Sequence, residues 1–267
     1  MKIRFLITGL LVCASLAAQA ADSLTESTFT EIIKQANVVA AADKSVTPAQ
    51  VNEIFRVPDL VRTGQDSRLE MTAPDKTITR VGENSVFTFE QGERNIRLEK
   101  GSVLFHPPAG VGGGTVKYGG TAAAVLGTTM ICAVMSDGSF KIMLLEGKAT
   151  VMLANGKTMV LGAGQMMIVP PNGDSFGPVT DINLAKLVPH LLLLNGFSNP
   201  LSSMPLIEDA IRLQNEQIAA GKEFHFDSLA TTGFGLDLIF DKFADISILL
   251  NTHDLTITLI SPTSGVR

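Results

Sequence analysis

"TAAAVLGTTMICAVMSDGS", residues 121–139, is among the most apolar stretches of the chain and decides its fold class. Its apolar part, residues 122–135, is too short to cross a bilayer as a helix, which takes about 20 residues. Residues 127–129 (Gly-Thr-Thr) interrupt it, and glycine and threonine are poor helix formers. Asp137-Gly138 then indicates a tight hairpin, because a two-residue type I′ turn needs positive φ at both positions. The stretch predicts two buried strands that meet at a bend, followed by a hairpin into a third strand at residues 140–145.

Several residues of these strands carry specific expectations. Leu126, Ile131 and Leu144 should be buried in central strands. Gly127 should adopt positive φ or lie against a neighbouring backbone, so that alanine there would destabilise the fold. Cys132 lies in an apolar strand and should be an inert core thiol.

The same pattern of short apolar or alternating runs covers the middle of the chain. Residues 68–72 and 95–99 alternate strictly, as half-buried strands do. Turn signals recur every 7–12 residues and include Asn155-Gly156. Further strands are expected at residues 77–81, 86–89, 103–105, 115–118, 149–153, 158–161 and 165–169. About ten short strands with this spacing predict an all-β sandwich, barrel or β-solenoid, and no fixed-length repeat chooses between them.

The pattern changes after Pro170. Residues 184–194 and 207–220 are predicted to be helical, with Pro189 limiting or kinking the first helix and Gly221 ending the second. Nearer the C-terminus, residues 246–250 and 255–260 fit two paired strands, and disorder beyond Ser261 fits the sequence equally well.

The first twenty residues have the features of a secretory signal. Lys2 and Arg4 precede an apolar stretch at residues 5–16, and Ala18-Gln19-Ala20 is an A-x-A cleavage site, which predicts cleavage after Ala20. Twelve helical residues span about 18 Å, against about 30 Å of hydrocarbon, so an uncleaved anchor is the less favoured alternative. We therefore expect a periplasmic or secreted chain with no membrane span after cleavage.

Composition and charge exclude further classes of protein. The chain has 267 residues, of which 45% are hydrophobic and 18% charged, which is enough to build a core. Removing Lys2 and Arg4 with the leader changes the formal charge from -5 to -7. An acidic exported chain without a basic stripe is not expected to bind nucleic acid. One cysteine remains, so no internal disulfide is expected.

The residues provide little chemistry. His106, His190, His225 and His253 have no metal-ligand spacing, and there is no G-x-S-x-G motif. The glycine-rich residues 110–114 are not followed by Gly-Lys-Ser/Thr, so a mobile loop is expected there rather than a phosphate site. No catalytic, cofactor-binding or metal-binding residue is predicted, and no cofactor.

Seven short motifs occur in order between residues 50 and 170 and resemble the FecR domain. They include "VRTGQDSRLEM" (residues 61–71), "LEKGSVLFH" (residues 98–106), "AAAVLGTTMICAV" (residues 122–134) and "LLEGKATVMLANGKTMVLGAGQ" (residues 144–165). The residues that fall on the family pattern are Arg62, Gly64, Ser67, Arg68, Gly82, Gly101, Gly127, Thr128, Glu146, Gly147, Gly164 and Gln165.

The resemblance implies a β-rich, solenoid-like stack and an exported signalling domain. The best-known members of the family receive a signal from an outer-membrane transporter and pass it through one membrane helix to a segment that controls a sigma factor. Here no cytoplasmic segment is expected before the leader and no span after it, so the exported domain carries over and the transmembrane relay does not.

The expected fold is therefore mainly β, a FecR-like β-solenoid or sandwich of about ten short strands with a smaller C-terminal helical segment. The division is a signal peptide (1–20), an N-terminal segment (21–49), the FecR-like domain (50–171), a helical segment (172–222) and a tail (223–267). The motif residues are interpreted as structural, since most are glycines at strand ends. Arg62 and Arg68 are expected to pair with Asp66, Glu70 or Asp75.

The favoured function is an exported non-catalytic binding protein whose partner is an envelope protein or a glycan. A structural envelope or surface protein that assembles through strand edges is the alternative. A glycan-active enzyme is least favoured, because no nucleophile, metal site or acid pair stands out. A polar pocket with clustered carboxylates would favour the enzyme, and a flat apolar patch would favour a partner surface.

Overall fold

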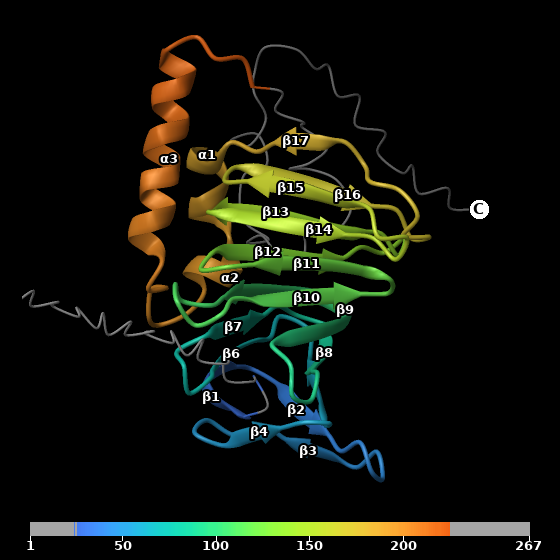
Figure 1. The fold of residues 1–267 in the computed structure, drawn as a ribbon. Helices are drawn as coiled ribbons and strands as arrows, with labels where there is room; N and C mark the ends of the chain where they lie inside the picture. The colour runs from blue at the N-terminus through green and yellow to red at the C-terminus, as the bar shows by residue number, and fades with distance from the viewer. Residues whose placement is uncertain (1–23, 25, 225–267) are drawn as a thin grey trace, which may run out of the picture.

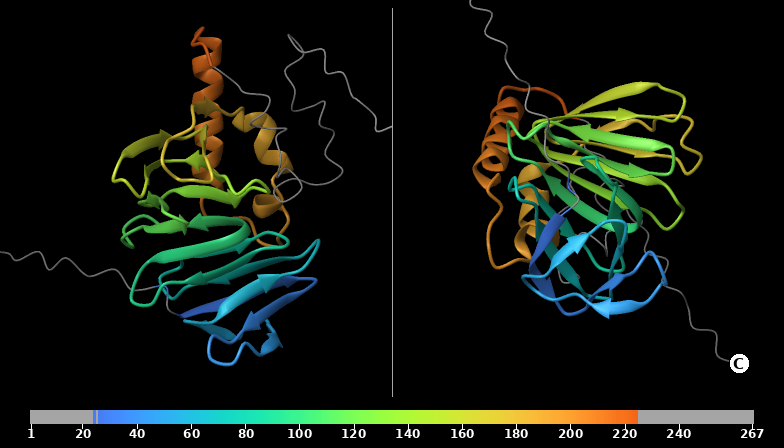
Figure 2. Two further views of the ribbon diagram at one scale, coloured as in Figure 1. Left: turned by 90° about the vertical axis from the view of Figure 1, so that its right-hand side faces the viewer. Right: turned by 60° about the horizontal axis from the view of Figure 1, so that its bottom comes forward.

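The computed structural model describes residue 24 and residues 26–224. Within these residues, seventeen strands form a stack, with the blue N-terminal strands at one end and the yellow strands at the other (Figure 1; Figure 2). They form two facing sheets, named A and B here. Strand β9 (Asn95–His106) belongs to both, because its first half pairs with sheet B and its second half with sheet A. The predicted mainly β class with a small helical segment is confirmed.

The strands of each sheet lie in the following order across it. Sheet A contains β4 (Ile54–Arg56), β1 (Glu26–Ile33), β6 (Arg68–Thr72), β7 (Ile78–Val81), the second half of β9, β12 (Thr129–Val134), β13 (Phe140–Glu146), β16 (Gln165–Val169) and β17 (Val179–Asp181). Sheet B contains β3 (Val46–Pro48), β2 (Ala36–Val39), β5 (Leu60–Thr63), β8 (Val86–Phe89), the first half of β9, β10 (Gly114–Tyr118), β11 (Thr121–Val125), β14 (Lys148–Met152) and β15 (Thr158–Gly162). Neighbours are antiparallel except β9 and β10, which are parallel.

More strands form than the expected ten because residues 26–63 contribute five of their own. These strands are β1 to β5, and they extend the same two sheets at one end. Residues 95–99 and 103–105, predicted as two strands, form the single strand β9. Gly101 lies inside β9 at positive φ (81°), at the point where the strand passes from sheet B to sheet A.

The apolar stretch of residues 121–139 forms β11 and β12, with the predicted bend between them. Side chains of a strand alternate between faces. In β12, Met130 and Cys132 face the core between the sheets, whereas Ile131 and Ala133 face a second core under the helices. Strand β12 is therefore apolar throughout because both of its faces are buried.

One core expectation for this stretch is wrong. Ile131 and Leu144 are fully buried as predicted, but Leu126 is 79% exposed. It continues the alternation of β11, whose Ala123 and Val125 point inward, and so it points away from the core. The sequence does not show that helices cover sheet A alone.

The hairpin between β12 and β13 also differs from the prediction. Met135 donates its N–H to the carbonyl of Ser139 (2.8 Å), and the N–H of Gly138 bonds to the carbonyl of Met135 (2.9 Å). Gly138 has positive φ (81°), whereas Asp137 does not. The connection is thus a three-residue loop that ends in a left-handed glycine, not a two-residue type I′ turn.

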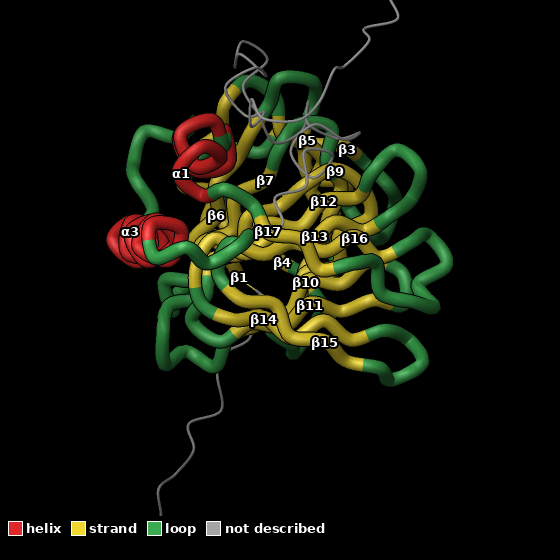
Figure 3. The backbone as a smooth tube through the Cα atoms, turned by 90° about the horizontal axis from the view of Figure 1, so that it is seen from above, coloured by secondary structure: helices red, strands yellow, loops and turns green. Residues whose placement is uncertain are grey.

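Short helices cover the outer face of sheet A. They are α1 (Leu184–Leu187), the 3₁₀ helix η1 (Val188–His190), α2 (Leu192–Asn195) and α3 (Met204–Ala219). Seen from above, α1 and α3 lie on the side of β6 and β7, away from β14 and β15 (Figure 3). The helix predicted at residues 184–194 is divided into three pieces, and Pro189 is the second residue of the 3₁₀ helix.

Arg80 of β7 fastens this helical segment to sheet A. Its side chain is fully buried, and Nε donates to Oε2 of Glu70 at 2.8 Å. The other guanidinium nitrogens donate to the carbonyls of Leu194 (2.8 Å) and Asn199 (2.6 Å). The guanidinium carbon lies 4.4 Å from the ring centroid of Phe197. One buried cation therefore holds helix α2 and the loop that follows it.

These contacts correct the ion pairs expected for Arg62 and Arg68. Glu70 pairs with Arg80, and Asp75 pairs with Arg94 at 2.5 Å. Arg62 is exposed on β5, and Nε of Arg68 is buried without a hydrogen-bond partner.

Leucines 144 and 126 provide a matched test of the two faces. Leu144→Ala should lower the free energy of unfolding by about 2–5 kcal/mol, because it leaves a cavity in the core. Leu126→Ala should change it by less than about 0.5 kcal/mol, as expected for a surface position. Urea unfolding of both variants measures the difference, and equal losses would contradict the assignment of faces.

Candidate functional site

The outer face of sheet B carries no helix over its last four strands within the described part of the chain (Figure 3). We name its outward side chains the exposed panel. The exposed panel consists of Thr115 and Lys117 on β10, Ala122, Ala124 and Leu126 on and after β11, Lys148, Thr150 and Met152 on β14, and Thr158 and Val160 on β15.

Strand register sets these side chains in rows. Thr115 lies opposite Ala124, which lies opposite Thr150, and Thr150 lies opposite Val160. Alanine and threonine side chains are small, so the middle of the exposed panel lies below the level of its borders. Larger apolar side chains border it, and Leu126, Met152 and Val160 are 79%, 47% and 59% exposed.

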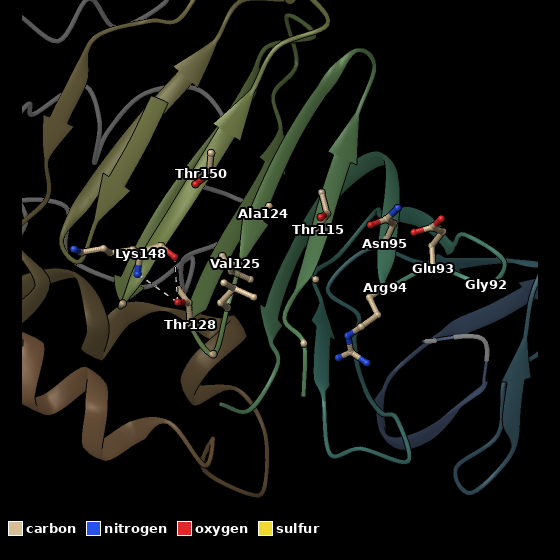
Figure 4. Close-up of a pocket in the computed structure, with 15 residues that line it drawn as sticks. Gly92, Glu93, Arg94, Asn95, Thr115, Ala124, Val125, Thr128, Lys148 and Thr150 are labelled. Carbon is tan, nitrogen blue, oxygen red and sulfur yellow. Dashed lines mark hydrogen bonds between the residues drawn. The ribbon is translucent and has the colours of Figure 1, made fainter. Parts of the chain in front are cut away.

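A depression of about 810 Å³ opens at one end of the exposed panel (Figure 4). Leu126, Thr128 and Lys148 line one side of it, and residues 93–95 with Gly112 and Gly114 line the other. Thr115, Ala124 and Thr150 also line it, and the close-up shows them in line across neighbouring strands (Figure 4).

Arg94 builds one wall of the depression. Its side chain is 9% exposed, and Nε donates to the carbonyl of Gly113 at 2.6 Å. Nη1 donates to Oδ2 of Asp75 (2.5 Å), and Nη2 donates to Oγ1 of Thr77 (2.8 Å). Both acceptors lie in the turn just before β7. The glycine-rich loop, predicted to be mobile, is thus anchored at Gly113.

The opposite wall is a corner built from two glycines and a hydroxyl. The N–H of Lys148 donates to Oγ1 of Thr128 (3.3 Å), and that hydroxyl donates to the carbonyl of Lys148 (3.2 Å). A Cβ on Gly147 would lie 2.4 Å from Oγ1 of Thr128, and one on Gly127 would lie 2.9 Å from Cα of Ala109. Both glycines also have positive φ, so the corner tolerates no side chain at either position.

The same contact recurs lower in the stack. The N–H of Ser102 donates to Oγ of Ser85 at 3.0 Å. A Cβ on Gly101 would lie 2.1 Å from that oxygen. At both corners, a side-chain hydroxyl packs against a glycine with positive φ and accepts a hydrogen bond from the next backbone N–H. The motif glycines Gly101 and Gly147 therefore have the same structural role.

The other motif residues lie away from the depression. Gln35 donates its N–H to Oγ of Ser67 (3.1 Å), and the N–H of Gly64 bonds to the carbonyl of Gln35 (3.0 Å). Gly82 bonds to the carbonyl of Ser102 through its N–H (2.9 Å). Gly164 bonds to the carbonyl of Leu144, and Oε1 of Gln165 accepts from the N–H of Gly162, both at 2.9 Å. The structure thus brings Gly127, Thr128 and Gly147 together at the depression and leaves the remaining motif residues elsewhere.

Glu146 belongs to a buried polar cluster under the helical segment. Oγ1 of Thr129 lies 2.8 Å from Oε1 of Glu146, 3.1 Å from Nδ1 of His106 and 2.7 Å from Oγ of Ser203. Burial raises the pKa of Glu146 against the hydrogen bonds from Thr129. Burial, with the charge of Arg80, lowers the pKa of His106. The cluster joins sheet A to the start of α3, and no sequence pattern linked its four members.

Other expectations concern metals and thiols. Among the described residues, no group of three His, Cys, Asp or Glu side chains is placed to hold a metal ion. Within the same residues, no helix is long and apolar enough to cross a membrane. Cys132 is buried and free, and burial raises the pKa of its thiol, so it is the inert core thiol predicted.

The comparisons identify the domain. Residues 59–150 match the family model described as FecR protein, so the chain contains a FecR domain, as the motifs predicted. Two crystal structures from Parabacteroides distasonis, each described as a candidate anti-sigma factor, are similar to it. They are 18% and 14% identical, cover 58% and 62% of this chain and 74% and 95% of their own, and have TM-scores of 0.42 and 0.41. No curated protein matches the chain.

Gly127→Ala should destabilise the protein by about 1–3 kcal/mol, because alanine would combine positive φ with a contact against Ala109. Gly156→Ala is the matched control, since Gly156 also has positive φ but faces open space. Urea unfolding should show the larger loss for Gly127→Ala. A loss no larger than that of the control would mean that the contact with Ala109 is readily relieved.

His106 should make stability depend on pH. Its pKa is lowered in the folded state, so its contribution is present above about 6.5, the value in the unfolded chain, and is lost as pH falls through the lower folded value. Between about pH 7.5 and pH 5, wild type should therefore lose unfolding free energy relative to His106→Gln. Urea unfolding at both pH values measures this, and a constant difference would contradict it.

Proposed function

We propose that this chain is an exported, non-catalytic binding protein that uses the exposed panel of its FecR domain to bind a partner in the cell envelope. Support for export comes from Lys2, Arg4 and the apolar residues 5–16, followed by Ala18-Gln19-Ala20. Support for binding comes from the exposed panel, a face of sheet B with three exposed apolar side chains, Leu126, Met152 and Val160.

The observation that carries the proposal is the exposure of Leu126 at the rim of the depression. Single exposed leucines are common, but Leu126 shares one face with Met152 and Val160, and small side chains lie between them. The corner of Gly127 and Gly147 fixes the backbone next to Leu126, so binding does not have to order the backbone there.

The chemistry of the exposed panel favours a protein over a glycan. Its charged members are Lys117, which pairs with Glu90 at 2.7 Å, and Lys148. Lys148 and the apolar rim suit a partner that presents a carboxylate beside apolar side chains. The residues that line the depression include no aromatic ring on which a sugar could stack. They include one carboxylate, Glu93, whereas glycoside hydrolysis generally uses two.

The test compares two leucine variants in capture from an envelope extract. Leu126→Asp should lose the captured partner, whereas Leu213→Asp on α3, where the leucine is 49% exposed, should retain it. Equal capture by both variants would reject the exposed panel as the binding surface. Co-sedimentation with purified cell-wall glycan that depends on Leu126 would assign the same surface to a glycan instead.

A further inference from the structure

Sheet B has an open edge at β15. In the described part of the chain, β15 pairs with β14 on one side and has no strand on the other. The N–H of Leu153 bonds to the carbonyl of Lys157, which fixes the alternation of the ladder. By that alternation, Met159 and Leu161 bond to β14, and the N–H and C=O groups of Thr158 and Val160 point outward.

This edge lacks the protection found on others. The other edge of sheet B is β3, which is three residues long and ends in Pro48. The edge of sheet A nearest to β15 is β17, which is also three residues long. Strand β15 has five residues and no proline, and Val160 is 59% exposed. At one end of the strand, the N–H of Gly162 donates to the side-chain oxygen of Gln165 (2.9 Å). Exposed edges of this kind are usually covered or charged in native proteins.

We propose that residues 255–260 of the same chain, LTITLI, cover this edge as an additional strand of sheet B. They lie outside the described residues. Leu255, Ile257 and Leu259 alternate with Thr256 and Thr258, which is the pattern of a strand with one buried face. Strand β14 has the same pattern, with its buried and exposed residues alternating.

The location of the described end agrees with this occupant. Helix α3 runs toward the end of the stack that carries β15 and β17 (Figure 1). Residues 225–254 connect Phe224 to the proposed strand, and when extended they reach up to about 100 Å, more than enough for this distance. Because the segment belongs to the same chain, its effective concentration at the edge is high.

Apolar partners are also available there. Met159 of β15 and Phe176 of the segment before β17 are partly buried and pack against the core between the sheets. The apolar face of residues 255–260 would extend that core, and its threonines would continue the outer face on which Thr158 lies.

Hydrogen exchange of the full-length chain tests the proposal. The amides of Thr158 and Val160 should exchange slowly, and Ile257→Asp should accelerate both by about tenfold or more, because it removes the hydrogen bonds of the added strand. Thr256→Asp is the matched control, since it adds the same charge on the opposite face and should leave both rates unchanged. The amide of Ile131, in the core strand β12, reports that each variant is folded.

Two results would overturn the proposal. The first is equal exchange of Thr158 and Val160 in wild type and both variants, which would mean that residues 255–260 do not cover the edge. The second is protection that falls on dilution and does not respond to Ile257→Asp, which would identify a second copy of the chain as the occupant. Neither result depends on Leu126, so this test and that of the proposed function fail separately.

Discussion

The burial of the Arg80 guanidinium is the constraint on which the arrangement of the molecule depends. A buried cation is costly unless it is paired and fully hydrogen-bonded. Burial lowers the pKa of Arg80, and the hydrogen bond and charge of Glu70 oppose that shift. The carbonyls of Leu194 and Asn199 complete the site, and both belong to the segment that covers sheet A. Without that segment, the cation and the apolar outer face of sheet A would be exposed together.

Two further polar contacts hold the rest of the helical segment. Ser203 before α3 lies against Thr129 in the buried cluster with Glu146. Farther along α3, Gln214 accepts from the N–H of Leu184 and donates to the carbonyl of Ile182, both at 2.9 Å. Because hydrogen bonds are directional, these contacts set the position of the helical segment on sheet A. The free energy that holds the segment there comes mainly from burial of apolar surface.

The covering of sheet A leaves sheet B as the face available for binding. The corners that join the layers, Ser85 over Gly101 and Thr128 over Gly147, demand glycine for steric reasons. The second corner also forms the rim of the depression beside Leu126. A residue that is essential for the fold can therefore position a binding surface without touching the partner, which is why the motif by itself does not locate the site.

The mainly β class, the bend at Gly127, the FecR domain and the buried Cys132 could all be predicted from the amino-acid sequence, because they follow from local alternation, glycine conformation and motif order. The sequence also predicted two helical regions, although the exact pieces around Pro189 depended on local geometry. The sequence did not predict that Leu126 is exposed or that Arg80 rather than Arg68 pairs with Glu70. It also did not predict that His106, Thr129, Ser203 and Glu146 form one cluster. Alternation assigns residues to two faces of a strand, but only contacts between segments distant in the sequence decide which face is covered.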